Sequence, residues 1–377
     1  MSDNSLRDAF IYDGGRTAFG RHAGALSPIR PDDLLAHAIK SVVERNPFEA
    51  AAYEDVIMGN TNGAGEDCRN VARFASLRAG MPTSVAGLTV NRLCGSGLAA
   101  TLDAARGVKA GEGELFLAGG VESMSRAPIV MSKAQTAFDR GQQIADSTLG
   151  ARFTNPAYGA KFGNDTMPET ADNIASDLSI SREESDAFAA ASQAKYEAAR
   201  VDGFFKEEII AIDVPQGRKK PDLTVDADEH PRPSSTLEVL GGLRSLSADG
   251  VVTAGSASGI NDGAAALIVG SGGIGEKYSV KPRVRIIAGA VAGVEPRVMG
   301  LGPVFAIRKA LARANLELKD MDIIEINEAF SAVVLANMQL LDIPHDKVNV
   351  NGGAVALGHP LGMSGARITL SLMNVLR

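Results

Sequence analysis

The sequence contains the stretch Asn91-Arg92-Leu93-Cys94-Gly95-Ser96-Gly97-Leu98, which joins the apolar segment Gly87–Asn91 to an alanine-rich segment. The apolar segment predicts a β-strand, and the small residues after it allow a tight turn into a helix. This order places Cys94 beside the first N–H groups of the predicted helix, whose partial positive charge favours a thiolate and lowers the pKa of the cysteine. The stretch predicts a nucleophilic cysteine in an α/β fold; a buried structural cysteine is the alternative.

A similar strand and turn recur near the end of the chain. The stretch Asn351-Gly352-Gly353-Ala354-Val355-Ala356-Leu357-Gly358-His359-Pro360-Leu361-Gly362 contains a histidine. His359 follows the apolar segment Asp322–Ile324 at nearly the spacing at which Cys94 follows Asp55–Ile57. Two equivalent turns can face one pocket, and imidazole is well suited to accept a thiol proton near neutral pH. The repeat predicts His359 as the base for Cys94; a capping or packing histidine is the alternative.

Short apolar runs that alternate with helical stretches predict an α/β protein with largely parallel sheets. The predicted strands are Asp8–Tyr12, Asp55–Gly59, Gly87–Asn91, Glu114–Ala118, Arg283–Ala288, Asp322–Ile326 and Lys347–Val350, and a further apolar strand lies within Val251–Val269. The second copy of the repeat has no counterpart of Glu114–Ala118 or of the strand within Val251–Val269. If the repeat holds, the second half lacks two strands.

A polar, proline-containing insertion separates two parts of the first copy. Within it, Ser181 and Glu184 have the spacing of a capping box for a helix over Glu183–Arg200, and Gly203 is a plausible stop. We therefore predict a first half over residues 1–122 and 250–273, an inserted loop domain over 123–249, and a second half over 274–377.

Composition and charge limit the class of protein. The 377 residues are 45% hydrophobic and 22% charged, which predicts two or three folded domains. The net charge of -7 gives no reason to bind nucleic acid or anionic lipid. No apolar run approaches the roughly 20 residues that span a bilayer, and the first predicted strand leaves no room for a targeting peptide. Two cysteines are too few for a disulfide framework, so we predict a cytoplasmic enzyme.

A third candidate site follows a predicted strand of the second half. Asn327-Glu328-Ala329-Phe330 comes directly after the strand Asp322–Ile326, and α/β sheets present functional residues at the carboxyl ends of strands. The amide of Asn327 could orient a water or a substrate carbonyl, and a helix N-cap is the alternative. We find neither a dinucleotide-binding glycine motif nor metal-ligand spacing, so no resident cofactor or metal is expected.

Together these motifs resemble the thiolase family from about Asp8 to the last residue. The resemblance rests on five ordered blocks: Asn91–Gly97, Gly119–Ser125, Ala257–Ser258–Gly259 with Asn261–Asp262–Gly263, Asn327–Phe330, and Gly352–Gly365. It implies an α/β, duplicated thiolase fold of two mixed five-stranded sheets in αβαβα layers, with the insertion as a loop domain that holds coenzyme A.

The resemblance also implies the roles of individual residues. His359 would activate Cys94 for attack on the 3-oxo carbonyl of an acyl-CoA, and coenzyme A, as a substrate, would then remove the shortened acyl group. Asn327 would hold an oxyanion-hole water, with His359 as the other donor. The substrate-binding residues implied in the same way are Ser258 at the pantetheine, Arg232 at the adenine end, and Met167, Ala329 and Phe330 at the acyl pocket.

Further segments, Gly65–Asp67 with Arg69–Arg73 and Met167–Asn173, look most like the 3-oxoadipyl-CoA thiolases of aromatic catabolism. An acetyl-CoA acetyltransferase of the biosynthetic type is the alternative. The family assembles as dimers and as tetramers, so the resemblance implies a homo-oligomer.

The sequence departs from the family pattern at its end. Thiolases close with a Cys-x-Gly segment whose cysteine moves a proton at the acetyl carbon, and this chain stops at Arg377 before it. We therefore expect a C-terminally truncated chain in which the last two strands of the second half are missing. Loss of a general acid-base group lowers rates by roughly 100- to 10,000-fold, so an impaired acyl-CoA-binding protein is a further alternative.

Overall fold

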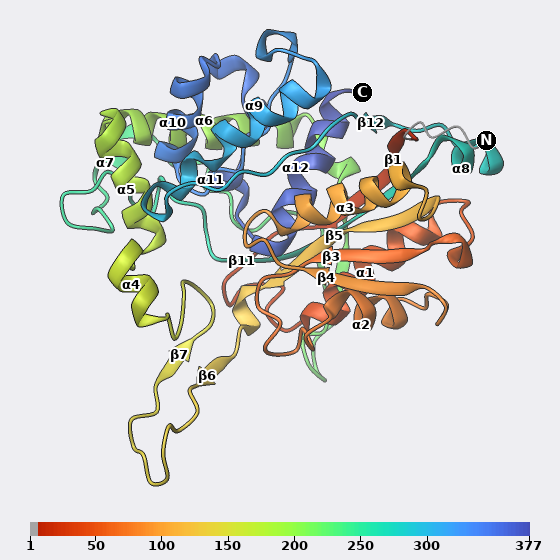
Figure 1. The fold of residues 1–377 in the computed structure, drawn as a ribbon, viewed down its shortest axis with the longest axis horizontal. Helices are drawn as coiled ribbons and strands as arrows, with labels where there is room; N and C mark the ends of the chain where they lie inside the picture. Colours follow the sequence, from red (N-terminus) through yellow and green to blue (C-terminus); the bar gives the residue numbers. More distant parts are fainter. Residues whose placement is uncertain (1–6) are drawn as a thin grey trace.

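The computed structural model describes residues 7–377. The chain is built around a mixed sheet (Figure 1). Its strands, in spatial order, are β12 (Val284–Ile286), β1 (Ala9–Thr17), β11 (Asn261–Ser271), β5 (Leu115–Ser123), β3 (Asp55–Gly59) and β4 (Ala86–Val90), with β2 (Gly20–Arg21) beside β11 and β8 (Ile209–Ile210) beside β1. β4, β3 and β5 are parallel, and β11 runs antiparallel to both β5 and β1.

The two faces of this sheet are covered by different helices. Every residue of β5 and β11 is buried, as expected of central strands covered on both sides. On β3, Val56 and Met58 pack toward α1 (Pro31–Glu44) and α2 (Val71–Arg78), whereas Ile57 packs toward the other face. That face is covered by α3 (Ser96–Ala110) and α12 (Leu361–Val375). The predicted α/β class is confirmed.

The predicted strands of the first half are present. β3 has the predicted bounds, β4 begins one residue earlier than predicted, and β5 continues five residues beyond Ala118. β11 begins only at Asn261, because the segment before it forms turns and bridges instead of a continuous ladder.

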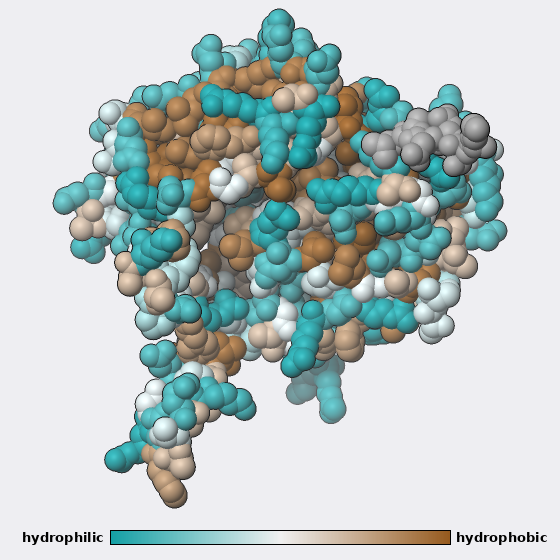
Figure 2. Space-filling model, in the orientation of Figure 1, coloured by the Kyte–Doolittle hydropathy of each residue, from teal (hydrophilic) through white to brown (hydrophobic). Residues whose placement is uncertain are grey.

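The second half differs from the prediction. It contributes β12 to the first sheet, and its helices α9 (Gly302–Ala314) and α10 (Ser331–Leu341) pack against each other. Ile324 and Val348 meet in one isolated parallel bridge, so the predicted second five-stranded sheet is not formed among residues 7–377. A single bridge supplies too few ladder hydrogen bonds to define paired strands. Figure 2 shows apolar side chains gathered over this half. The two missing strands stay a prediction.

The insertion forms a separate group of short elements. They are β6 (Ile129–Met131), β7 (Ile144–Asp146), α4 (Pro156–Phe162), α5 (Met167–Leu178), α6 (Arg182–Val201), β9 (Ile212–Val214), β10 (Leu223–Val225) and α7 (Leu237–Gly241). The β6–β7 hairpin projects from the body of the molecule (Figure 1, Figure 2). The predicted capping box of Ser181 and Glu184 is confirmed at α6, and Gly203 adopts the left-handed conformation just after the helix.

A buried ion cluster holds part of the insertion against the sheet. Arg16 of β1 is fully buried and pairs with Glu208 at 2.9 Å and Asp228 at 2.7 Å. Short helices α8 (Gly272–Tyr278) and α11 (Ala354–Leu357) complete the α-helices of the described chain. The predicted domain boundaries stay a prediction.

Between residues 7 and 377, no helix is long and apolar enough to cross a membrane. The same part of the chain contains no group of three or more histidine, cysteine, aspartate or glutamate side chains arranged to hold a metal ion.

Candidate active site

Cys94 lies in the turn between β4 and α3, as predicted. Arg92 N donates to Ser96 Oγ at 2.8 Å, and Leu93 N donates to Asn91 Oδ1 at 2.9 Å. Leu93 adopts a positive φ of 49° directly before the cysteine. A bulky residue in this conformation is strained, so the turn is held by its hydrogen bonds. The turn places Cys94 one residue before the N-cap of α3, Gly95.

The electrostatic prediction for Cys94 is wrong. Burial raises the pKa of the Cys94 thiol to about 11, a nearby backbone N–H lowers it by less, and the charge of Glu122 raises it further. The side chain nevertheless keeps partial exposure to solvent. Desolvation of the charged form outweighs the helix N-terminus here, so the group is a neutral thiol at neutral pH. A nucleophile in this state needs a base beside it.

His359 lies in the matching turn, between α11 and α12. Its side chain is 4% exposed, and burial, followed by the charge of Arg367, lowers the pKa of the imidazole to about 3. The ring is therefore neutral at physiological pH. Its backbone N–H donates to Asn261 Oδ1 at 3.0 Å, which fixes the turn against β11.

The hydrogen-bond network assigns the tautomer of His359. Ser364 Oγ donates to the carbonyl of Pro360 at 2.9 Å, so its oxygen accepts from His359 Nδ1–H at 2.6 Å. Nε2 is then unprotonated, and its lone pair accepts from Asn327 Nδ2 at 3.3 Å. His359 in this state is a proton acceptor at Nε2, and it becomes a donor at that atom only after a proton has been taken up.

Asn327 is brought to His359 by the segment that follows Ile326. The next residue, Glu328, is buried and accepts from Ser192 Oγ at 2.7 Å, Asn349 Nδ2 at 2.8 Å and Val355 N at 3.1 Å. Burial raises the pKa of Glu328, and these donors oppose that shift. The buried Oδ1 of Asn327 has no hydrogen-bond partner among residues 7–377, which leaves one acceptor of this amide unsatisfied.

Four of the predicted substrate-binding residues form one wall beside Asn327. Ser258 N donates to the carbonyl of Ala329 at 2.9 Å, and Ala257 bridges Phe330. Phe330 is buried in an apolar cluster against which Met167, the first residue of α5, packs. The structure thus brings Ser258, Ala329, Phe330 and Met167 together.

Arg232 is exposed. Its backbone N–H donates to Gln193 Oε1 at 2.9 Å, and Gln193 Nε2 donates to the carbonyl of Val355 at 3.3 Å. Its link to the His359 segment therefore passes through the side chain of Gln193.

Comparisons with known proteins agree with this geometry. Residues 9–272 match the model of the thiolase N-terminal domain, and residues 280–377 match that of the thiolase C-terminal domain. The chain belongs to the thiolase family. It is 54% identical over 375 residues to the 3-oxoadipyl-CoA/3-oxo-5,6-dehydrosuberyl-CoA thiolase of Escherichia coli K12, an alignment that covers 98% of this chain and 93% of that relative.

Two solved thiolase-family structures have the same fold. The acetyl-CoA acetyltransferase of Bacillus anthracis superposes with a TM-score of 0.92 at 37% identity, covering 99% of this chain and 93% of that one. Human mitochondrial 3-ketoacyl-CoA thiolase in complex with CoA superposes with a TM-score of 0.91 at 40% identity, covering 99% and 92%. This thiolase is therefore an α/β acyltransferase of that fold.

Several residues around this thiolase site were missed or misjudged from the sequence. Ser364 and Asn261 lie inside quoted motif blocks, but their contacts with His359 could not be read from those blocks. His230 is partly buried and would meet any Cβ on Gly259, beside Ser258. Burial, followed by the charge of Arg232, lowers the pKa of His230 to about 4.

Proposed function

We propose that this thiolase cleaves 3-oxoadipyl-CoA with coenzyme A, giving acetyl-CoA and a shortened acyl-CoA through an acyl-cysteine at Cys94. The observation that supports the chemistry is that His359 is neutral and unprotonated at Nε2. This histidine lies in the turn that matches the Cys94 turn. The observation that carries the substrate is the 54% identity to a 3-oxoadipyl-CoA thiolase. The acyl-chain assignment rests on that likeness.

In the first half-reaction, His359 Nε2 takes the proton of Cys94 as the sulfur attacks the C3 carbonyl carbon. The new imidazolium N–H then faces the developing oxyanion, as does a water held by Asn327. Breaking the C2–C3 bond leaves the acyl group on sulfur and releases the acetyl-CoA fragment as an enolate. That enolate must take up one proton to become acetyl-CoA, and transfer of the proton that His359 took from Cys94 balances the step and returns His359 to its neutral form.

In the second half-reaction, the thiol of coenzyme A gives its proton to His359 Nε2 and attacks the thioester carbonyl of acyl-Cys94. The C–S bond to Cys94 breaks, the shortened acyl-CoA leaves, and the cysteine sulfur recovers the proton. The same base can serve both steps because each begins with the neutral imidazole, the form that its lowered pKa favours at neutral pH.

The insertion supplies the binding side of the proposal. Met167 on α5, together with Phe330 and Ala329, would line the acyl chain, and Ser258 would contact the pantetheine. The exposed Arg232 would contact the adenine end of coenzyme A. Support for this placement is the wall that Ser258 forms with Ala329 beside Asn327.

We also propose a homo-oligomer in the cytoplasm. β4 lies at the edge of the sheet, and Phe74, Leu77 and Leu88 on and beside it are between 41% and 50% exposed. An edge strand with apolar neighbours is a common site of pairing with a second chain. Both cysteines are free thiols, in keeping with a reducing compartment.

The test measures two reactions on the 377-residue chain. Cleavage of 3-oxoadipyl-CoA and of acetoacetyl-CoA is followed with added coenzyme A, and acetyl transfer from acetyl-CoA to Cys94 is followed by mass spectrometry. A kcat/KM for 3-oxoadipyl-CoA at least about tenfold above that for acetoacetyl-CoA supports the proposed substrate. The reverse preference favours the biosynthetic acetyltransferase.

Comparing the two reactions separates catalysis from binding alone. Acetyl transfer needs Cys94 and His359, whereas cleavage also needs proton transfer at the acetyl carbon. Acetyl transfer without cleavage would assign the chain to the impaired alternative with an intact nucleophile. If Cys94 takes up no acetyl group at all, the proposed mechanism is wrong.

A further inference from the structure

Glu122 is a buried carboxylate to which the mechanism above gives no task. It lies near the carboxyl end of β5, within the block Gly119–Ser125, and is 3% exposed. One of its oxygens, Oε2, accepts from Thr61 N at 3.0 Å and from Gly362 N at 2.9 Å. These donors are 61 and 240 residues away in sequence, so the carboxylate joins three distant parts of the chain.

Each donor is attached to one of the two turns of the active site. The carbonyl of Thr61 accepts from Asn91 Nδ2 at 3.0 Å, and Asn91 Oδ1 in turn accepts from Leu93 N, next to Cys94. Gly362 is the second residue of α12 and follows His359 by three positions. A chain of hydrogen bonds therefore runs from the Cys94 turn through Glu122 to the His359 turn.

The backbones around this chain are packed without side chains between them. A Cβ on Gly120 would lie 2.1 Å from the carbonyl oxygen of Gly362, and one on Gly97 of α3 would lie 2.7 Å from Ala366 N of α12. Only glycine permits such an approach of one backbone to another. The carboxylate of Glu122 thus acts where the two helices that follow the catalytic turns are in direct contact.

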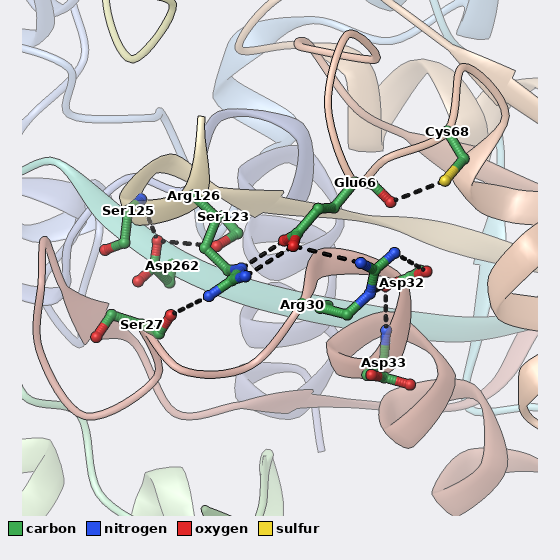
Figure 3. Close-up of polar contacts among 10 residues, drawn as sticks. All are labelled: Ser27, Arg30, Asp32, Asp33, Glu66, Cys68, Ser123, Ser125, Arg126 and Asp262. Carbon is green, nitrogen blue, oxygen red and sulfur yellow. Dashed lines mark hydrogen bonds and ion pairs between the residues drawn. The ribbon is translucent and has the colours of Figure 1, made fainter. Parts of the chain in front are cut away.

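The loop on the outer side of Glu122 is fixed by charged groups. Figure 3 shows Glu66 between Arg30 and Arg126, and Arg126 Nη2 lies 2.7 Å from Glu66 Oε1. The following residue, Asp67, accepts from Asn60 Nδ2 at 2.9 Å, and the same amide lies 3.5 Å from Glu122 Oε1. Burial, followed by the charge of Asp67, raises the pKa of Glu122 to about 7.

We propose that Glu122 is a positioning residue for acyl transfer, which holds the Cys94 turn and the His359 turn at a fixed separation. It touches neither the reacting atoms nor the substrate. The proposal rests on the proposed function of Cys94 and His359 and assigns a task to the block Gly119–Ser125. Glu122 is not an electrostatic activator of Cys94, because its negative charge disfavours the thiolate.

This role predicts effects of opposite sign on two reactions of the same sulfur. Alkylation of Cys94 by iodoacetamide at pH 10 requires only the thiolate, which solvent can generate without His359. Acetyl transfer from acetyl-CoA at pH 8 requires that the Cys94 thiol, the His359 base and the thioester carbonyl be correctly placed relative to one another. Removal of the Glu122 charge favours the Cys94 thiolate, so alkylation becomes faster. Without that charge the two turns are also held less firmly at their separation, so acetyl transfer becomes slower.

The experiment compares Glu122→Gln and Glu122→Ala with the parent chain. A glutamine oxygen still accepts from both backbone donors, so we expect acetyl transfer to fall about tenfold, and about 100-fold when alanine removes the bridge. Alkylation at pH 10 should rise about two- to fivefold in both variants. Asp67→Asn is the matched control: it alters the other buried acid on Asn60 without touching either turn, and it should change acetyl transfer less than about threefold.

A second variant interrupts the same chain of hydrogen bonds at Asn91, its exposed end. Asn91→Ala removes both the donor to the Thr61 carbonyl and the acceptor for Leu93 N, and it leaves the Glu122 carboxylate in place. If both residues act through one chain, Glu122→Gln combined with Asn91→Ala will be no slower than the slower single variant, by a double-mutant cycle. This result is expected even if Glu122→Ala fails to fold.

The outcomes separate this proposal from the proposed function. A parent chain that takes up no acetyl group contradicts the proposed function. A parent that is acetylated, with Glu122→Gln and Asn91→Ala additive or within twofold of the parent, overturns the positioning role alone. Alkylation and acetyl transfer that fall together also overturn it, because a general loss of structure would explain both.

Discussion

The Cys94 turn and the His359 turn both lead into a helix without a side-chain cap, but Cys94 is less buried than His359. Each connects to a helix, α3 or α12, whose N-cap residue, Gly95 or Pro360, makes no side-chain cap. Cys94 stays partly exposed with a thiol pKa raised to about 11, whereas His359 is buried with a pKa lowered to about 3. Burial favours the neutral form of both groups. The difference bears on the proposed mechanism: both residues rest uncharged, and the proton transfer that we propose would take place only when an acyl group reaches the partly exposed Cys94.

Replacement of the exposed member should have the largest effect. Cys94→Ala removes the only group in the site that forms the proposed thioester, so we expect acetyl transfer to the protein to fall at least about 1,000-fold. Mass spectrometry of the protein after incubation with acetyl-CoA measures this. Cys68→Ser, at the other free thiol, is the control and should retain the acetyl group; an acetylated Cys94→Ala chain would move the nucleophile elsewhere.

Replacement of the buried His359 should slow acetyl transfer less than replacement of Cys94. Part of the lost rate should return as the pH rises. His359→Gln keeps the size of the side chain and loses the base, so acetyl transfer at pH 7 should fall roughly 100- to 1,000-fold. Because solvent can remove the proton of Cys94 near its pKa of about 11, the deficit should shrink as the pH rises toward 10. A deficit that is constant between pH 7 and pH 10 would contradict the assignment of His359 as the base.

The same histidine predicts how stability depends on pH. The folded pKa of His359, about 3, lies below its ordinary value, so its contribution to stability is full above about pH 6.5 and is lost as the pH falls from there toward 3. The contribution to the free energy of unfolding should fall by about 1.4 kcal/mol per pH unit. Denaturant unfolding of the parent and of His359→Gln at pH 6.5 and pH 5 measures the difference, and His22→Gln, at an exposed histidine, should leave the parent's slope unchanged.

Ser364, the hydrogen-bond partner of His359 Nδ1, allows a further test of the His359 turn. Ser364→Ala removes the acceptor that holds the proton on Nδ1, so part of the population will carry it on Nε2 instead. We expect acetyl transfer to fall about tenfold, with KM for acetyl-CoA nearly unchanged. Thr369→Ala is the control, since its hydroxyl donates only to the carbonyl of Gly365 on the same helix. Equal losses in both variants would mean that α12, and not the tautomer, had been disturbed.

The sequence predicted the features that local patterns specify. β3, the capping box of α6 and the two turns depend on neighbouring residues, and each is present. The predicted second sheet was wrong, because Asp322–Ile326 and Lys347–Val350 have strand-like patterns but the formation of a sheet depends on distant partners.

The candidate site shows the same limit. The residue types of Cys94, His359 and Asn327 and their places after strands indicated the site, and the structure brings Asn327 to His359. The pKa of Cys94 could not be predicted from its turn, because it depends on how deeply the folded chain buries the thiol and on the charge of Glu122, 28 residues away. The contacts of Glu122 were also hidden, since Gly362 is 240 residues away.

The smallest expected effect concerns the stability that the two turns lose because their helices lack a side-chain cap. Where α3 and α12 lack side-chain caps, α6 has a complete capping box, in which Ser181 Oγ accepts from Glu184 N at 3.1 Å and Glu184 Oε2 accepts from Ser181 N at 2.7 Å. Ser181→Ala should lower the free energy of unfolding by about 1 kcal/mol and leave acetyl transfer unchanged. Gly95→Ser, which offers a cap at the Cys94 turn, should gain little stability and slow acetyl transfer, because its hydroxyl would compete for the N–H groups beside the nucleophile. Denaturant unfolding and the acetylation rate of both variants decide this, and a Gly95→Ser chain that is both more stable and fully active would show that the turn has no need of an uncapped helix end.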